Sequence, residues 1–458
     1  MTLTRRDMLA SAAAFSCLPR ASMAEPGPVL NAREGVQQLA PSDFAPTPVW
    51  GYDGAVPGPL IRLAQGTRLR RRLVNDLPQP TAVHWHGIRI DNAMDGVPGL
   101  TQPAVAPGAS FDYDFTVPDA GTYWYHSHNR SVEQVARGLY GALVVEEAEA
   151  PDVDHDLPLA IDDWRLDPAT LQITDDFDSF HDLSHAGRIG NLTTVNGRFD
   201  PEQTVRAGDR LRLRLINVAN ARVFEVGLSG LEGWIVALDG MPLDTPLPIT
   251  GAFSLAPAQR ADLIVDVTAT SGETADLLSL ERDGGYGLMR FAIGAGGASR
   301  RPAPDALPPN PLPALSDPAS APLHTLTMQG GAMRGLPPSM LGATLLQPRE
   351  LAERGKFWAL NGIVDRPADP FIDIARGETA RIAMVNDTAF PHAMHLHGHH
   401  FRAIADTGAL GPWRDTLLVP QGQTRQIALH ADNPGKWLLH CHMLGHAAAG
   451  MMTWFNVS

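Results

Sequence analysis

Histidine and cysteine are the residues of this sequence whose types and spacing point most directly to chemistry. Ten of the 17 histidines fall into four short motifs, and no histidine occurs between His185 and His324. The motifs are His84-Trp85-His86-Gly87, His126-Ser127-His128, His392-Ala393-Met394-His395-Leu396-His397 and His440-Cys441-His442-Met443-Leu444-Gly445-His446. Imidazole and thiolate groups are common ligands of copper and zinc in proteins. The clustering therefore predicts a metalloprotein whose ligands come from two distant parts of the chain.

The spacing within each motif sorts these side chains by the face of a strand. Alternate side chains of a β-strand point to the same face, so the two members of each His-x-His pair should lie together. Cys441 lies between His440 and His442 and should point to the opposite face. His392 is an odd number of positions from His395, which places it on the face of Cys441, where His446 can join it from the following loop. The sequence therefore predicts two sites back to back.

One of these sites would hold a thiolate and two imidazoles. With a weak axial thioether, this ligand set is typical of a mononuclear blue-copper site, and Met451 is the axial candidate ten residues after Cys441. Zinc is the competing ion for a Cys/His cluster. A zinc site would not explain the eight further imidazoles in matched pairs. The pattern therefore favours copper.

An internal repeat indicates which elements hold the motifs. Residues 66–75, 208–217 and 377–386 each begin with glycine, carry arginine four positions later and end with asparagine. Polar and apolar residues alternate within them, as in a half-buried strand. Each copy follows a glycine turn, and these turns are Asp53-Gly54, Asn196-Gly197 and Asn361-Gly362. The sequence thus predicts three copies of one strand-rich unit.

The composition agrees with an all-β fold. The 43 glycines and 39 prolines among 458 residues favour short strands and turns over a helical bundle. Residues 301–322 hold eight prolines, which predicts an extended linker. We expect β-sandwich domains at 25–149, 150–300 and 322–458, joined by a linker at 301–321. The middle domain should bind no metal, because its repeat lacks a histidine motif.

The N-terminus resembles an export leader. Arg5 and Arg6 precede an apolar run that ends at Leu18, and a small-residue site ends at Ala24. We predict a signal peptide at residues 1–24, of the twin-arginine type, and a periplasmic product. A Sec leader or a short anchor is the alternative.

Charge and cysteine content narrow the possible partners. The net charge of −14 argues against nucleic acid or an anionic membrane as a partner. After the leader no segment is long enough and apolar enough to insert into a membrane. The two cysteines are Cys17, in the predicted leader, and Cys441, so no disulfide framework is expected.

Taken together, the four histidine motifs resemble those of the multicopper oxidases, the family of laccases, ascorbate oxidase and bacterial copper-efflux oxidases. The resemblance covers the whole chain after the leader. It implies three consecutive cupredoxin-like domains of the Greek-key β-sandwich type and four copper ions per chain. It also implies that the three-copper cluster lies between the first and third domains, with the middle domain as a spacer and part of the substrate surface.

The resemblance implies a role for each ligand. The implied type 1 copper ligands are His392, Cys441, His446 and Met451. The implied type 2 copper ligands are His84 and His395. The implied ligands of the type 3 copper pair are His86, His126, His128, His397, His440 and His442.

The implied activity couples four one-electron oxidations of a donor to the reduction of O2 to two waters. The tripeptide His440-Cys441-His442 would carry electrons between the two sites, because its side chains reach both faces. Asp95 matches an acidic residue that supplies protons in the family; its alternative is a turn aspartate before Gly96. Copper-efflux members have glutamate after the last type 1 histidine, where this chain has Ala447. Whether Glu133 replaces that acid stays open.

The donor is a phenol or aromatic amine in the laccase-like interpretation, and Cu(I) in the alternative of a cuprous oxidase for periplasmic copper tolerance. The stretch from 325 to 340 holds Met328, Met333 and Met340, which fit loop packing better than a Cu(I) site. A non-catalytic relative is disfavoured by the complete ligand set. Donor preference, redox potential and oligomeric state are not readable from the sequence, although a monomer suffices.

The remaining notable residues receive structural interpretations. His155, His181, His185, His324 and His430 are expected in solvated loops. His399 and His400 are expected behind the ligands or at the surface. Trp85, Trp124 and Trp437 should pack in the core, and Arg260 in Pro257-Ala258-Gln259-Arg260 is taken as structural.

Overall fold

The computed structural model describes residues 27–458 except 283, 298, 300 and 316, so the predicted leader at 1–24 lies outside the described residues. The described chain is built from strands, with a few short helices, and the strands form three pairs of sheets. The predicted all-β fold is confirmed. No helix among the described residues has the length and apolar character needed to cross a membrane.

The first pair of sheets contains the His84 and His126 motifs. One sheet has the order β2 (Thr47–Tyr52), β1 (Val29–Gln37), β4 (Arg68–Asn75), β6 (Ser110–Thr116). The other has the order β3 (Gly58–Ala64), β8 (Tyr140–Glu146), β7 (Gly121–Ser127), β5 (Val83–His86). The short helices η1 (Asn92–Met94) and α2 (Ser131–Ala136) lie in its loops.

The second pair of sheets forms the middle of the chain. One sheet has the order β10 (Leu192–Val195), β9 (His155–Trp164), β12 (Arg210–Asn217), β17 (Arg260–Val267), β14 (Leu231–Leu238), β15 (Met241–Pro248). The other has the order β11 (Glu202–Ala207), β19 (Gly284–Gly297), β18 (Thr274–Glu281), β13 (Phe224–Ser229), β16 (Phe253–Leu255). Helix α3 (Phe180–Ser184) lies between β9 and β10 in the chain.

The third pair of sheets contains the other two motifs. The larger sheet has the order β22 (Thr344–Leu346), β21 (Ser339–Leu341), β24 (Ile363–Val364), β23 (Trp358–Leu360), β20 (Leu323–Gly330), β26 (Thr379–Asp387), β31 (Thr424–His430), β28 (Phe401–Ile404), β29 (Leu410–Arg414). The smaller sheet has the order β25 (Ile372–Ile374), β33 (Met452–Val457), β32 (Gly435–Cys441), β27 (His392–Leu396), β30 (Thr416–Val419). Helices α4 (Pro348–Ala352) and α5 (Leu444–Ala448) complete this unit.

The sequence repeat corresponds to one strand in each unit. Strands β4, β12 and β26 each lie between a parallel neighbour (β1, β9 or β20) and an antiparallel one (β6, β17 or β31). The closing asparagines Asn75, Asn217 and Asn386 act alike. Each side-chain amide donates to backbone carbonyls, and each side-chain oxygen accepts from the N–H two residues on. The repeat therefore fixes how each strand ends.

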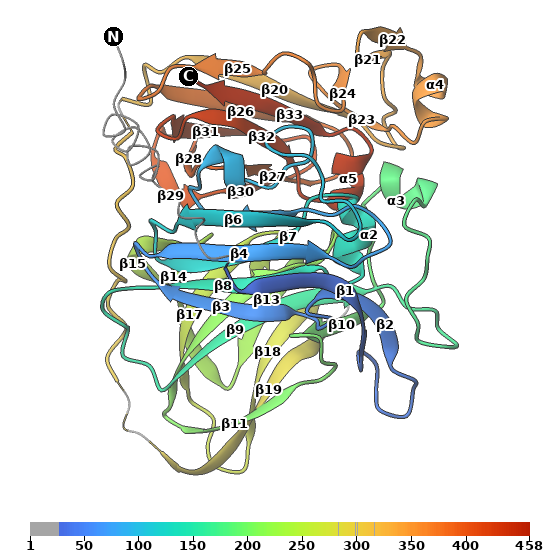
Figure 1. Ribbon diagram of the computed structural model, residues 1–458. Coiled ribbons are helices and arrows are strands. Elements are labelled where there is room, and N and C mark those ends of the chain that lie inside the picture. The colour runs from blue at the N-terminus through green and yellow to red at the C-terminus, as the bar shows by residue number, and fades with distance from the viewer. Residues whose placement is uncertain (1–26, 283, 298, 300, 316) are drawn as a thin grey trace, which may run out of the picture.

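The three units stack with the first between the other two in Figure 1, where blue to teal strands lie between orange-red ones above and green-yellow ones below. Buried apolar residues of the first and third units form one continuous cluster. Residues 301–315, which have no helix or strand, run back from the middle unit to the third. Asn310 pins this segment to the first unit through two hydrogen bonds with Ala120. All four histidine motifs lie in the first and third units.

Candidate metal centre

A buried cluster of His392, Cys441 and His446 lies in the third unit. Strand β27 supplies His392, β32 supplies Cys441, and α5 supplies His446. The Cys441 Sγ atom is 3.6 Å from His392 Nδ1 and 3.7 Å from His446 Nδ1, and the two Nδ1 atoms are 3.0 Å apart. One ion placed among these three atoms could bind all of them.

The Nε2 nitrogens of the two imidazoles, which face away from the cluster, both have hydrogen-bond partners. His392 Nε2 lies 2.8 Å from the hydroxyl of Thr388, and His446 Nε2–H donates over 2.7 Å to the backbone carbonyl of His185. A proton on Nε2 leaves the Nδ1 lone pair directed at the cluster. Met451 is buried, and its backbone carbonyl accepts a 3.1 Å hydrogen bond from the N–H of Cys441, which places it beside this cluster.

Burial sets the charges of these groups in the metal-free chain. It raises the pKa of the Cys441 thiol to about 12, and it lowers the pKa of His446 to about 4. The thiol is therefore protonated and the imidazole neutral at neutral pH. A bound cation would displace the thiol proton, because the thiolate is the ligand form.

Eight further histidines meet where the first and third units touch. Strands β5 and β7 pair His84 with His126, and strands β27 and β32 pair His395 with His440. Imidazole rings of the first unit stack on imidazole rings of the third unit. The His84 and His397 centroids are 4.0 Å apart, and those of His86 and His395 are 3.7 Å apart. The structure therefore brings together the pairs that the two-residue spacing placed on one face.

Most of these imidazoles direct the same nitrogen inward. Nδ1–H groups donate to backbone carbonyls of Asp95 (from His84, 2.8 Å), Ser127 (from His126, 3.0 Å), Asp415 (from His395, 3.0 Å) and Cys441 (from His440, 3.0 Å). The Nε2 lone pairs are then free to bind metal. Among the described residues, the buried Nε2 atoms of His84 and His395 have no hydrogen-bond partner. Such orphaned nitrogens fit a metal-binding role, because buried polar atoms are otherwise almost always paired.

The eight rings fall into smaller groups. Nitrogens of His128, His397 and His440 lie within 4.8 Å of one another. The rings of His86, His126 and His442 form a second triangle, with centroid separations of 5.0, 5.1 and 5.7 Å. The remaining two, His84 and His395, have centroids 5.9 Å apart. Two sites of three imidazoles beside one of two can be built from this arrangement.

Comparison with known proteins identifies the family. Three family models described as multicopper oxidase match residues 27–150, 155–273 and 338–458. The chain belongs to the multicopper oxidase family. Members of this family are copper-binding oxidoreductases that use O2, and their domains are cupredoxin-like, as the sequence predicted.

The individual relatives align with most of the length of this chain. The chain is 31% identical to Multicopper oxidase MmcO of Mycobacterium tuberculosis, over 88% of this chain and 82% of the relative. It is 27% identical to Copper resistance protein A of Pseudomonas syringae pv. tomato, over 87% and 88%. Among solved structures, Lac15 from a marine microbial metagenome has 44% identity and a TM-score of 0.76, covering 94% of this chain and 100% of that one.

Asp95 of this multicopper oxidase lies against the eight-histidine site, directly after η1. Its carboxylate is buried and accepts a 3.0 Å hydrogen bond from His397 Nδ1–H. Its carbonyl accepts from His84. Asp95 is thus more than a turn residue, because it orients imidazoles of two different motifs.

Asp415 and Arg260 are residues whose place the sequence did not reveal. Asp415 is buried between β29 and β30, with Oδ1 3.4 Å from His86 Nε2. Arg260, which begins β17 of the middle unit, makes a double hydrogen bond to the Asp415 carboxylate. Burial opposes ionisation of Asp415, but the Arg260 guanidinium holds its pKa well below the usual value. The interpretation of Arg260 as merely structural is therefore incomplete. Asp415 lies in no sequence motif that could have identified it.

Trp358 was also missed by sequence reasoning. Its ring centroid is 4.4 Å from that of His446 and 5.0 Å from that of His392. Its indole N–H donates over 2.6 Å to the carbonyl of Leu183, in α3. Trp358 therefore joins the cysteine-containing cluster to a helix of the middle unit.

The predicted loop position was wrong for four of the other histidines, although none of these four is buried. His155, His324 and His430 lie in strands β9, β20 and β31, where pairing with distant strands extends the sheet into segments expected to be loops. His181 lies in the short helix α3. His185 follows α3, and its carbonyl holds His446. His399 and His400 are both buried, which excludes a surface position and agrees with a place behind the ligands. The expected core positions of Trp85, Trp124 and Trp437 agree with their burial.

Glu133 is poorly placed to replace the acid missing at Ala447. Burial works to raise the pKa of Glu133, but hydrogen bonds from Gln79 and Arg137 lower it overall. Its described partners are Gln79, Arg130 and Arg137, at 3.0 to 3.1 Å. A carboxylate held ionised by two arginines is a weak proton donor.

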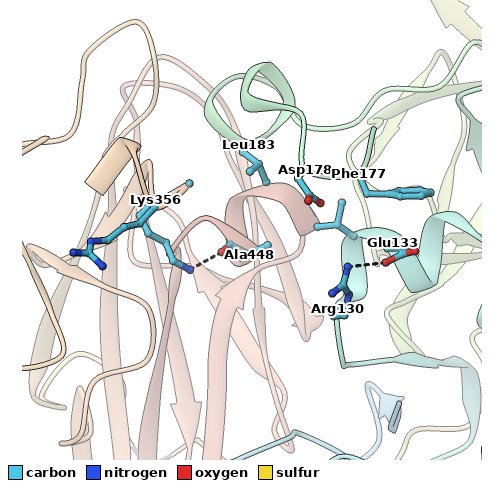
Figure 2. Close-up of a pocket in the computed structure, with 10 residues that line it drawn as sticks. Arg130, Glu133, Phe177, Asp178, Leu183, Lys356 and Ala448 are labelled. Carbon is cyan, nitrogen blue, oxygen red and sulfur yellow. Dashed lines mark hydrogen bonds and ion pairs between the residues drawn. The ribbon is translucent and has the colours of Figure 1, made fainter. Parts of the chain in front are cut away.

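A pocket of about 380 Å³ opens beside α5, where the three units meet. Figure 2 shows side chains from α2, from the loop and helix around α3, and from residues 354–356 converging on it. Val132, Phe177, Leu183 and Ala448 form its apolar lining, and Arg130, Glu133, Asp178, Arg354 and Lys356 provide charge. Leu183 connects this pocket to Trp358 and hence to His446.

Proposed function

We propose that this multicopper oxidase is laccase-like: it oxidises a small phenolic or aromatic donor in four one-electron steps and reduces O2 to two waters. The observation that carries the proposal is the position of Cys441. Its thiol lies in one metal cluster, while its neighbours His440 and His442 lie in the other. Three consecutive residues thus connect an electron-accepting site with an eight-imidazole site.

The ligand assignments follow from the geometry together with the family. His392, Cys441 and His446, with Met451 as axial ligand, would hold the type 1 copper. His84 and His395 would hold the type 2 copper. The two triangles of imidazoles would hold the type 3 pair, giving four copper ions per chain. When bound, copper supplies the one-electron redox chemistry and the site where O2 is reduced.

The protein's own groups shape the electron path. The carbonyl of Cys441 accepts a 3.0 Å hydrogen bond from Nδ1–H of His440. This contact links the cysteine to an imidazole of the second site through one peptide group. Complete burial of Cys441 and its neighbours keeps water away from the path.

Asp95 would manage protons at the eight-histidine site. Reduction of one O2 to two waters consumes four protons along with four electrons. The Asp95 carboxylate lies within hydrogen-bond distance of His397 Nδ1, and no other carboxylate except Asp415 contacts these imidazoles within the described residues. Asp415 is already bound to Arg260, which leaves Asp95 as the group for proton supply.

The surroundings of the type 1 site favour a phenolic donor over Cu(I). The 380 Å³ pocket combines an apolar lining that includes Phe177 with charged groups at its edge, and it can accommodate one aromatic ring with a polar substituent. By contrast, Met328 is buried in the core and Met340 lines a different pocket, while Met333 is exposed. These three methionines do not form one thioether site. The cuprous oxidase remains the second candidate, supported by the similarity to Copper resistance protein A.

The proposal places the enzyme in the periplasm, exported through the leader at 1–24, and treats it as a monomer. It also keeps domain boundaries at 25–149, 150–300 and 322–458. All eight imidazoles and the cysteine come from one chain, so a partner subunit is not needed to complete the sites.

A steady-state comparison of two donors tests the function. Oxygen consumption is measured with a methoxyphenol and with Cu(I), each at matched concentrations and with the same copper-loaded protein. The laccase-like proposal predicts faster turnover of the phenol. Preference for Cu(I) would establish the cuprous alternative. If neither donor supported O2 consumption, both candidate functions would be contradicted.

A further inference from the structure

We propose that the middle domain, which donates no histidine, positions ligands of the three-copper site through a clamp on Asp415. The clamp consists of Arg260, Asp239 and Gln259, which all belong to the middle unit. This inference rests on the proposed function, since it concerns how that site is assembled.

Asp415 touches imidazoles from both halves of the site. Its Oδ1 atom is 3.4 Å from Nε2 of His86, in the first unit. Its backbone carbonyl accepts from Nδ1–H of His395, in the third unit. Neither ring nitrogen of His86 has a hydrogen-bond partner among the described residues, and Nε2 is the one that lies toward the Asp415 carboxylate. This leaves Nδ1 of His86 as the nitrogen that would face a metal ion, whereas the imidazoles whose Nδ1–H donates to a backbone carbonyl keep Nε2 for that role.

Arg260 fixes the Asp415 carboxylate in place. Its Nη1 atom donates to Oδ1 over 2.9 Å and its Nη2 atom to Oδ2 over 2.5 Å. Its Nε atom donates to the carbonyl of Thr122, in β7, over 3.2 Å. The guanidinium therefore contacts all three units, and its planar fork sets the angle of the carboxylate as an ammonium group could not.

Two more middle-domain residues hold the same segment from the other side. Asp239 Oδ2 accepts from Arg414 Nε over 2.7 Å, and Asp239 Oδ1 accepts from the backbone N–H of Arg260 over 2.9 Å. Gln259 donates to the carbonyl of Thr416 over 3.0 Å. The residues that flank Asp415 are thus restrained together with its side chain.

Gly87 makes room for this clamp. A Cβ atom at Gly87 would lie 2.3 Å from Arg260 Nη2 and 2.6 Å from Asp415 Oδ2, and the residue has φ of +87°. The glycine directly follows His86 in the first histidine motif. The motif therefore supplies two imidazoles and also the space in which the ion pair supports one of them.

The test compares copper retention in Arg260→Lys and Asp415→Asn with that in the wild type. Arg260→Lys keeps the charge but loses the fork, and Asp415→Asn keeps the shape but loses the charge. Each variant is loaded with copper and challenged with a chelator, and copper per chain, blue colour and the paramagnetic resonance spectrum of type 2 copper are recorded. We expect about 10- to 100-fold weaker retention at the three-copper site and an altered type 2 spectrum, with blue colour preserved.

Arg210→Lys is the matched control. Arg210 forms the same double hydrogen bond with buried Asp266 in the middle unit, with distances of 2.6 and 2.8 Å. It should leave copper retention unchanged. Wild-type retention and spectrum in both site variants, or an equal loss in Arg210→Lys, would overturn the clamp while the proposed function stands. A wild type that binds no copper at the three-copper site would overturn the function and the clamp together.

Discussion

His446 of the third unit donates a 2.7 Å hydrogen bond to the backbone carbonyl of His185 in the middle unit. Two further hydrogen bonds hold the same segment: Trp358 donates to the carbonyl of Leu183, and the N–H of Ala332 donates to that of Ser184. His446 is fully buried beneath these contacts. Helix α3 therefore covers the imidazole edge at which a donor would deliver electrons.

Loosening α3 should increase the oxidation of bulky donors. Asp182 anchors the helix through a double hydrogen bond to Arg165. In Asp182→Ala we expect kcat/KM for a large phenol to rise about two- to tenfold, because about 1 kcal/mol of anchoring is lost. The measurement is steady-state kinetics with a small and a large phenol.

The control for this change is Asp175→Ala. Asp175 lies in the same part of the middle unit, and its exposed carboxylate forms an ion pair with Arg137 of the first unit. It should leave both donors unaffected. A large-donor rate that falls or stays constant in Asp182→Ala would mean that α3 does not restrict access.

Replacing Cys441 by serine should separate the two metal sites. The hydroxyl is a poor copper ligand compared with a thiolate, so Cys441→Ser should lose the blue colour and turnover. The eight imidazoles are unchanged, so copper at their site should remain. Absorption spectra and copper analysis of the purified variant provide the check. Retained colour would refute the assignment of Cys441.

Asp95→Asn should slow the reaction with O2 without removing copper. The amide oxygen can still accept from His397, but the group no longer carries a transferable proton. We expect reoxidation of the reduced enzyme to be about 10²- to 10⁴-fold slower, the range for loss of a general acid. Stopped-flow mixing with O2 measures it directly. Wild-type reoxidation would return Asp95 to a purely structural role.

The copper-free protein should lose stability as the solution is acidified below about pH 6.5. Burial lowers the pKa of His128 to about 3 and that of His446 to about 4. Below the ordinary histidine pKa, the unfolded chain binds protons at these histidines, whereas the folded chain keeps them neutral. The free energy of unfolding therefore falls on acidification, by up to about 1.4 kcal/mol per histidine and pH unit. Above that pH these groups are neutral in both states and add no dependence.

Melting temperatures of the copper-free protein between about pH 8 and pH 5 test this sign. Asp162 and Asp163 act in the opposite direction, because burial raises the pKa of both carboxyl groups, but they are two groups against several histidines. Bound copper should raise the melting temperature at neutral pH, since it binds only the folded site. A melting temperature that increases on acidification would contradict the assignment of neutral, buried imidazoles.

Local spacing was enough to predict much of the arrangement of the histidine and cysteine side chains in the candidate metal centre. The side-chain period of a strand placed His440 and His442 opposite Cys441, and this holds because β32 is regular up to Cys441. The repeat likewise located β4, β12 and β26, since glycine and asparagine are needed at the ends of each copy.

Contacts between units were not readable in this way. The pairing of Arg260 with Asp415 joins residues 155 positions apart, and neither residue has a local pattern that identifies the other. Likewise, the carbonyl of His185 binds His446 through a backbone atom, which any residue type could supply. Such features depend on how the units dock, which local sequence does not encode.

The copper content and colour of the fully loaded wild-type protein test the central claim most directly. Two metal sites joined through Cys441 predict four copper ions per chain and an intense blue absorption. A chain that saturates with a single copper ion, or that takes up four without becoming blue, would contradict the proposed sites.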